Sequence, residues 1–267
     1  MSDIDNERIL EENRKLHNFS ANNFDNYPPN IMRELKDMLF VDVSCMQVML
    51  CPKLIRTFRA LDCGAGTGIL GEILVNKNFD TYLMDISKEM IEICKKKTDN
   101  KAKYIVSDAQ SLLAHTPKKF DVICFTSVLH HIKDYIGVLE LAIDRLNPGG
   151  FIYIADEPQL VTKEKPMSCK MIEWFEGNII NTYRLCKNPK HALNFLSKKD
   201  ADFDVSIAEF HAAKGIDEKK IQDLFDKKGF KTIGFSTYRF HSLKMLQWFD
   251  WFYKNQPKTF KMMARKK

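Results

Sequence analysis

The sequence lacks several features that would place it in a specialised class of protein. Its seven cysteines include no Cys-x-x-Cys pair, which argues against a zinc site and against a disulfide framework. No run of about 18 apolar residues occurs, so no membrane-spanning or membrane-inserted helix is predicted. Residues 1–16 are charged and have no apolar core of a signal peptide. These absences predict free thiols, no bound metal and a cytoplasmic location.

A strong charge of one sign is also missing. Forty-one Lys and Arg against 35 Asp and Glu give a net charge of +6 over 267 residues, which is a modest excess for a chain of this length. The basic residues are scattered, apart from short groups such as Lys95, Lys96 and Lys97 at the end of a helix-like segment. The charge therefore argues against a nucleic-acid partner, and the sequence leaves the oligomeric state open.

What is present is an alternation of strands and helices from residue 57 onward. Short apolar runs typical of buried strands occupy 57–63, 81–86, 103–109, 120–128 and 151–157. Helical patterns lie between most of them, and a parallel sheet needs such crossovers, which then cover both of its faces. A further helix at 217–228 precedes a strand from Phe230, and 258–267 is expected to form a last edge strand. The pattern predicts a doubly wound α/β fold.

Three glycines crowd the stretch LDCGAGTGIL at 61–70, where the first predicted strand turns into a helix. In open α/β sheets ligands bind at this turn, and glycine allows a ligand to approach the main chain. A dinucleotide fingerprint would place its third glycine at position 69, which is Ile69 here. The Gly-Lys-Ser/Thr of a nucleoside-triphosphate loop is absent. A different ligand is therefore indicated.

LDCGAGTGIL resembles the glycine motif of the class I S-adenosylmethionine-dependent methyltransferases. The resemblance extends through an acidic end of the second strand, SDA after the third, FDVICFTSVLHHI and LNPGGFIYIADE, and covers 57–157. It implies a Rossmann-like, mostly parallel seven-stranded sheet and S-adenosylmethionine as cofactor. The sequence lacks the Asn/Asp-Pro-Pro-aromatic signature of the branch that methylates nucleic-acid amino groups. It is most similar to the small-molecule group of the family.

The resemblance implies a role for each residue of the cofactor site. Asp85 would accept hydrogen bonds from the ribose diol, and Asp108 would lie near the adenine amino group. Each has a plain alternative, since Asp85 can help a helix to start and Asp108 can cap one. The expected cofactor-binding residues are Asp62, Gly64, Ala65, Gly66, Gly68, Asp85, Ile86, Asp108, Ala109 and Thr126.

Methyl transfer is a direct displacement, so the main task is to hold the acceptor in line with the methyl carbon. A base is required where the acceptor is a hydroxyl. Candidate bases follow the fourth and fifth strands or close the insertion, and they are His130, His131, Asp156, Glu157 and His211. Each of them has a structural alternative, such as capping a helix or packing.

Substrate selection in this group commonly falls to segments outside the sheet. Here these are an N-terminal helical lid at 1–50 and an insertion at 158–213 within a methyltransferase domain at 51–267. Five aromatic residues of these segments either line an apolar acceptor pocket or pack within the lids: Phe19, Phe24, Tyr27, Trp174 and Phe175. An aromatic stretch at 241–257 either packs internally or binds a partner.

The predicted function is methyl transfer to a small-molecule acceptor, with the acceptor atom left open. A non-catalytic S-adenosylmethionine-binding protein, acting as a sensor or assembly factor, would carry the same cofactor motif. An NAD-dependent oxidoreductase would share the acidic residue after the second strand, but the glycine spacing argues against it.

Overall fold

A computed structural model of the chain describes residues 5–50, 56–162, 166–189, 203–243, 246, 248 and 258–267. Within these residues one seven-stranded sheet has the order β3-β2-β1-β4-β5-β7-β6, and all neighbouring pairs are parallel except those that involve β7. The strands are β1 (Arg59–Cys63), β2 (Asp80–Asp85), β3 (Lys103–Val106), β4 (Phe120–Thr126), β5 (Leu146–Pro158), β6 (Phe230–Tyr238) and β7 (Thr259–Lys266). The predicted doubly wound α/β fold is confirmed.

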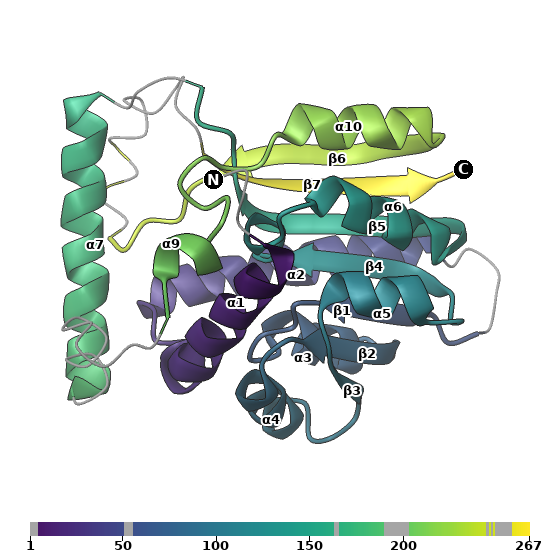
Figure 1. The fold of residues 1–267 in the computed structure, drawn as a ribbon, viewed down its shortest axis with the longest axis horizontal. Helices are drawn as coiled ribbons and strands as arrows, with labels where there is room; N and C mark the ends of the chain where they lie inside the picture. The colour runs from purple at the N-terminus through teal and green to yellow at the C-terminus, as the bar shows by residue number, and fades with distance from the viewer. Residues whose placement is uncertain are drawn as a thin grey trace.

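Helices alternate with the strands and flank the sheet (Figure 1). They are α1 (Asn6–Ser20), α2 (Pro29–Leu50), α3 (Ile69–Asn76), α4 (Lys88–Lys97), α5 (Ala109–His115), α6 (Tyr135–Asp144), α7 (Met167–Lys187), α9 (Val205–Ala208) and α10 (Glu218–Lys227). Two short 3₁₀ helices, η1 (Ala21–Asn23) and η2 (Leu129–His131), lie near the ends of α1 and β4.

Two hydrophobic clusters bury the two faces of the sheet. On one face, side chains of α5, α6 and α10 pack against the strands, as Leu113, Leu139 and Phe225 illustrate. On the other face α2 and α3 pack, through residues such as Val43 and Leu74. Burial of apolar surface on both faces is the main driving force for this layered arrangement.

The expectation that 258–267 forms an edge strand is wrong. The strand β7 lies inside the sheet, antiparallel to β5 on one side and to β6 on the other, so β6 is the edge. The physical reason is visible in its side chains, because Met262, Met263 and Ala264 are all buried in succession. A strand covered on both faces buries consecutive residues, whereas an exposed edge strand alternates.

Several local predictions are confirmed. Ser87 caps α4, since its hydroxyl accepts a hydrogen bond from the backbone N–H of Met90 at 3.1 Å. Gly229 has φ 75° and ends α10 directly before β6. No disulfide joins two of the described cysteines.

Within the described ranges no helix is long and apolar enough to cross a membrane.

The segments outside the sheet gather beyond one end of the strands. Figure 1 shows α1 and α9 at the end of the sheet, with α7 standing further out. α1 and α2 fall within 1–50, and α7 and α9 fall within 158–213; the division into a lid, a domain and an insertion stays a prediction. Most of the aromatic stretch at 241–257 lies outside the described residues.

Candidate functional site

A cavity of about 530 Å³ opens at the carboxyl ends of β1, β2, β4 and β5. The strand order reverses between β1 and β4, which is where ligands bind in open α/β sheets. Predicted site residues that line it are Asp62, Gly64, Ala65, Gly66, Asp85, Ile86, Asp108, Ala109, Thr126, His131 and Asp156. Gly68, His130, Glu157 and His211 are predicted site residues outside this lining.

The glycine turn brings the main chain of β1 close to its neighbours. Gly64 has φ 77°, and a Cβ atom on it would lie 2.5 Å from a methyl carbon of Val128. Only glycine fits such a combination of left-handed backbone and close contact. Gly68, also left-handed with φ 87°, precedes α3 and lies against Cys94. Gly64 therefore shapes the cavity wall, whereas Gly68 allows α3 and α4 to pack closely.

The Asp85 carboxylate at the end of β2 is held by the backbone. Its Oδ2 accepts a hydrogen bond from the Gly66 N–H and its Oδ1 accepts one from the Ser87 N–H, both at 2.8 Å. Burial nevertheless raises the pKa of Asp85 above its ordinary value, although the nearby His17 and these N–H groups act in the opposite direction. Each oxygen keeps a lone pair for a ligand in the cavity.

At the strand ends of the cavity, two buried polar atoms have no partner among the described residues. They are Oδ1 of Asp62 and Oγ1 of Thr126, at the ends of β1 and β4. Burial, with repulsion from Asp85 as the second cause, raises the pKa of Asp62 to about 7. Because an unpaired buried polar group is costly, both atoms indicate a polar ligand.

Asp108 follows β3 and caps α5. Its Oδ1 accepts a hydrogen bond from the Ser111 N–H at 2.8 Å, so the capping alternative is confirmed. Asp108 lines the cavity as well, together with Ala109 and Ile86, so capping leaves a ligand-binding role for Asp108 open.

Glu157 and His130 form a buried ion pair behind the cavity wall. The Glu157 carboxylate accepts hydrogen bonds from the N–H groups of Val128, Leu129 and His130, and one oxygen lies 2.8 Å from His130 Nδ1. Burial acts to lower the pKa of His130, but the adjacent carboxylate outweighs it and raises that pKa. The pair fixes η2 rather than facing the cavity.

His131 follows in η2 and lines the cavity. Its Nδ1 lies 3.0 Å from the carbonyl oxygen of Ala208, so Nδ1 carries the proton and Nε2 keeps a lone pair in the neutral ring. Burial, followed by the neighbouring His130 and His17, holds the pKa of His131 well below its ordinary value. His131 is therefore a neutral hydrogen-bond acceptor at physiological pH.

Asp156 lies near the end of β5 in a left-handed conformation, with φ 58°. The pairing of β5 with β7 shifts register at this point, which accommodates the unusual backbone. The Tyr238 hydroxyl accepts from the Asp156 N–H at 2.9 Å and donates to its Oδ1 at 3.4 Å. Burial, followed by the charge of Glu157, raises the pKa of Asp156 to about 6.

His211 ties the insertion to η2. Its backbone N–H donates to the carbonyl oxygen of His130 at 2.7 Å, and its Nε2 lies 3.1 Å from the carbonyl oxygen of Lys133. Since that carbonyl can only accept, Nε2 carries a proton there. The imidazole is thus engaged in the protein, while the next residues, Ala212 and Ala213, line the cavity.

Helices α1, α2 and α7 line the cavity with apolar side chains, including Leu10, Ile31, Leu35 and Ile180. Of the five predicted aromatic residues, Phe24 and Tyr27 line it. Phe19 packs on Phe203, with ring centroids 5.5 Å apart. Trp174 and Phe175 lie outside the lining and are 71% and 47% exposed. The acceptor-pocket alternative therefore fits two of the five.

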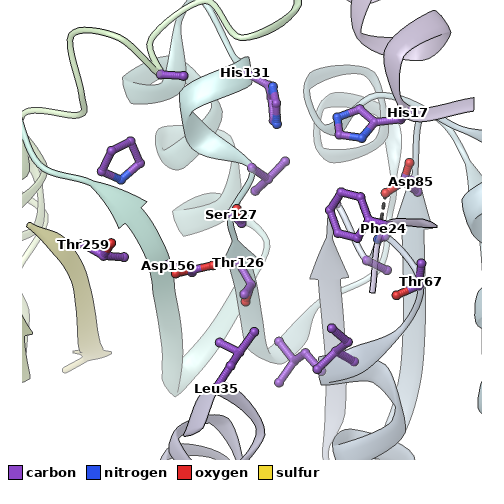
Figure 2. A pocket seen from close by; sticks show the side chains of 18 of the residues that line it. His17, Phe24, Leu35, Thr67, Asp85, Thr126, Ser127, His131, Asp156 and Thr259 are labelled. Carbon is purple, nitrogen blue, oxygen red and sulfur yellow. Dashed lines mark hydrogen bonds between the residues drawn. The ribbon is translucent and has the colours of Figure 1, made fainter. Parts of the chain in front are cut away.

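A polar latch joins the lid to the glycine turn. Oδ1 of Asp25, just after η1, accepts a hydrogen bond from the Thr67 hydroxyl at 2.6 Å, and Lys97 of α4 contacts both side chains. Sequence analysis missed this latch and also His17, which lies beside Asp85 in the cavity (Figure 2). The only sequence signal for His17 is its place on a helix that was expected to form a lid.

Within the described residues, no group of three or more His, Cys, Asp or Glu side chains is arranged to hold a metal ion. The site thus combines a glycine turn, acidic side chains at the ends of β1, β2 and β3, and an apolar cover. This defines an α/β domain with a small-molecule cavity at its switch point.

Residues 14–233 match a family described as "Methyltransferase domain". The match spans most of the chain, so the protein belongs to this methyltransferase-domain family.

Curated relatives match over a shorter region. The ubiquinone biosynthesis O-methyltransferase of Aliivibrio fischeri (strain MJ11) is 27% identical over 100 residues, which cover 36% of this chain and 43% of that protein. The enzyme of the same description from Vibrio cholerae (strain M66-2) is 28% identical over 100 residues, covering 36% and 41%. The chain therefore spans less than half the length of these relatives.

Solved structures share the fold over nearly the whole chain. The N-methyltransferase NodS from Bradyrhizobium japonicum WM9, in complex with S-adenosylhomocysteine, has a TM-score of 0.55 at 13% identity and covers 98% of this chain and 99% of that one. Magnesium protoporphyrin IX methyltransferase from Synechocystis, with bound S-adenosylmethionine, has a TM-score of 0.54 at 13% identity, covering 96% and 97%. At such identities the likeness establishes the fold.

Proposed function

We propose that the protein transfers a methyl group from S-adenosylmethionine to a small-molecule acceptor by direct displacement. The observation that carries this proposal is one cavity lined by two unlike sets of residues. Asp62, Asp85 and the glycine turn provide polar groups, and helix residues such as Ile31 and Leu35 provide apolar side chains. Membership of the methyltransferase-domain family supports it.

The residues present fit the cofactor. The unpaired Oδ1 of Asp62 and Oγ1 of Thr126 match a ligand that brings an ammonium group or hydroxyls into a buried site. We propose that Asp85 accepts hydrogen bonds from the diol with its remaining lone pairs, and that Asp108 accepts one from the amino group. When bound, the cofactor supplies a methyl group on a sulfonium. The protein's task is then to hold the acceptor in line and exclude water.

Two of the five candidate bases line the cavity, and they offer different chemistry. Asp156, with a pKa of about 6, is ionised at neutral pH and can take a proton from an acceptor hydroxyl or ammonium. His131 presents Nε2 as a neutral acceptor that orients a protic group. We propose Asp156 as the base, His131 as an orienting residue, and Glu157, His130 and His211 as supports that hold η2.

The acceptor is proposed to be small and largely apolar, because lids of α1, α2 and α7 close the cavity over it. Nucleic acid is not the proposed partner, since the net charge is modest. We propose a cytoplasmic location, because no disulfide joins two of the described cysteines. Recovery of the native protein in a membrane or secreted fraction after cell fractionation would contradict this.

Calorimetric titration with S-adenosylmethionine, S-adenosylhomocysteine and NAD tests the cofactor. Binding of the first two and not of NAD is expected, and binding of NAD alone would overturn the proposal. Asp85→Ala should weaken S-adenosylhomocysteine binding by about 1–3 kcal/mol, as expected when hydrogen bonds to a charged group are lost. Asp223→Ala, an exposed site on α10 outside the cavity lining, is the matched control and should bind as the wild type does.

Turnover separates an enzyme from a cofactor-binding protein. Release of S-adenosylhomocysteine is measured with panels of hydroxyl, amine, thiol and carboxylate acceptors. Tight cofactor binding with no release on any acceptor class would favour the sensor alternative, whereas acceptor-dependent release that Asp156→Asn lowers would support the proposed chemistry.

A further inference from the structure

The lid helix α1 carries polar side chains into the cavity. Asn13 and His17 are four residues apart, so they lie on one face of this helix, and both line the cavity. The His17 ring lies edge-on to His131, with centroids 4.8 Å apart, and next to Phe24 at 6.1 Å. Neither α1 residue falls in the stretch 57–157 that carries the glycine and acidic motifs.

The hydrogen-bonding capacity of these side chains is not used up by the protein. The ring nitrogens of His17 make no hydrogen bond to any other described residue. The Asn13 amide nitrogen donates to the carbonyl oxygens of Ile9 and His131, at 3.1 and 3.3 Å, but its buried Oδ1 has no partner there. Polar groups left unpaired in a cavity wall indicate a ligand that completes them.

His17 lies beside Asp85, as Figure 2 shows, and the Asp85 charge acts on the imidazole. Burial nonetheless lowers the pKa of His17, so the ring is neutral at physiological pH and has one donor and one acceptor nitrogen. An ionised Asp85 can only accept. A vicinal diol has two hydroxyls that both donate and accept, so the two side chains together match it better than Asp85 alone.

We propose that His17 is a ligand-binding residue, which hydrogen-bonds the same ribose diol as Asp85 and so ties α1 to the bound cofactor. This rests on the proposed function, since S-adenosylmethionine supplies the diol. Hydrogen bonds already join α1 to the segment before α9 and to η2, through Glu12 with the Asp204 N–H and through Asn13 with the His131 carbonyl. Cofactor binding therefore adds a hydrogen-bonded link that runs from α1 through the ligand to Asp85 of β2.

The test is titration of the full-length protein with S-adenosylhomocysteine and with its 2′-deoxy and 3′-deoxy analogues. His17→Phe keeps an aromatic ring against His131 and Phe24 but removes both nitrogens. It should weaken S-adenosylhomocysteine binding about tenfold, the effect of one lost hydrogen bond. One deoxy analogue, lacking the hydroxyl that His17 contacts, should bind His17→Phe and wild type equally.

His17→Gln keeps a donor and an acceptor and should retain most of the affinity. His17→Leu keeps neither and should weaken binding about tenfold, so it replaces His17→Phe if that variant does not fold. Asn18→Leu is the matched control, because Asn18 is on the same helix and has an unpaired Oδ1 but does not line the cavity. It should bind as the wild type does.

Three results are distinguishable. Equal affinity of folded His17→Phe and wild type for S-adenosylhomocysteine would overturn the assignment. The assignment would also be overturned if His17→Phe bound both deoxy analogues more weakly than wild type by the same factor as it binds S-adenosylhomocysteine. The ring would then act by packing. Failure of the wild type to bind either S-adenosylmethionine or S-adenosylhomocysteine would instead overturn the proposed function itself.

Discussion

Two parts of the cavity wall are built in different ways. The strand wall, at β1, β2 and β3, is formed by consecutive segments whose backbone N–H groups already hold Asp85 in place. The cover is assembled from α1, α2, α7 and the segments after β5 and β6, which are far apart in the chain. The strand wall is preorganised by local geometry, whereas the cover depends on long-range packing. Changes to buried groups that fix either part should therefore have larger effects than changes at the part-exposed contact between them.

The largest effect is expected for Glu157→Gln, because this carboxylate holds η2 and so positions His131 in the cavity. Breaking a buried ion pair costs about 3 kcal/mol or more of unfolding free energy. The folded pKa of His130 is raised by its partner, so the stabilisation is full below the unfolded pKa and is lost as pH rises through the folded value. Urea unfolding at pH 5.5 and pH 8 should show a larger loss at pH 5.5.

Equal losses at the two pH values would show that the charge of His130 contributes nothing to the pair. Glu89→Gln, on the exposed first turn of α4, is the control with the same chemical change and should leave unfolding nearly unaltered.

Gly64→Ala tests the preorganised strand wall at the glycine turn after β1. The new Cβ meets Val128 at 2.5 Å in a left-handed backbone, and overpacking with backbone strain should destabilise the fold by about 2–3 kcal/mol. Gly177→Ala is the matched control, because a Cβ there has no neighbour within 4 Å and alanine favours a helix. Denaturant midpoints of the two variants should move in opposite directions; equal stability of Gly64→Ala and wild type would contradict the close approach.

Asp62 gives a smaller, proton-linked effect. With a pKa of about 7 in the free protein, this carboxyl is about half protonated at pH 7. A cationic ligand group beside it lowers the pKa, so binding should release protons and affinity should rise between pH 6 and pH 8. Calorimetry in buffers of different ionisation enthalpy measures the release, and Asp62→Asn should remove it while Asp85 remains. Release that persists in Asp62→Asn would assign it elsewhere.

The smallest effect is expected at the latch between the strand wall and the cover. Asp25→Ala removes a carboxylate that is 33% exposed and that contacts Thr67 and Lys97, so unfolding free energy should fall by about 1 kcal/mol. The lid should also open more often, seen as faster amide hydrogen exchange in α1 with the sheet unchanged. Asp37→Ala, an exposed change on α2, is the control. If α1 exchanges its amide hydrogens at the same rate in both variants, the latch does not hold the lid.

The strand wall and the cover also differ in how much of their structure the sequence predicts. Residues 57–157 carry strong local signals, so the strands, the Ser87 cap, the glycine turn and the placing of Asp62, Asp85 and Asp108 at one edge follow from pattern and spacing. Among the candidate bases the sequence does not distinguish Asp156, which lines the cavity, from Glu157, which is consumed by four donors. Adjacent residues on a strand point to opposite sides, and the bulge in β5 alters which side each one takes.

By itself, the sequence determined the alternation of strands and helices, the bare glycine turn and the acidic residues after successive strands. These follow from short-range properties, namely backbone freedom, hydrophobic period and capping. Only the tertiary structure decided that β7 lies inside the sheet, that His17 reaches Asp85, and that Glu157 faces η2 instead of the cavity. Each of these depends on which distant segments pack together, and the free energy of that packing is a property of the whole fold rather than of any local stretch.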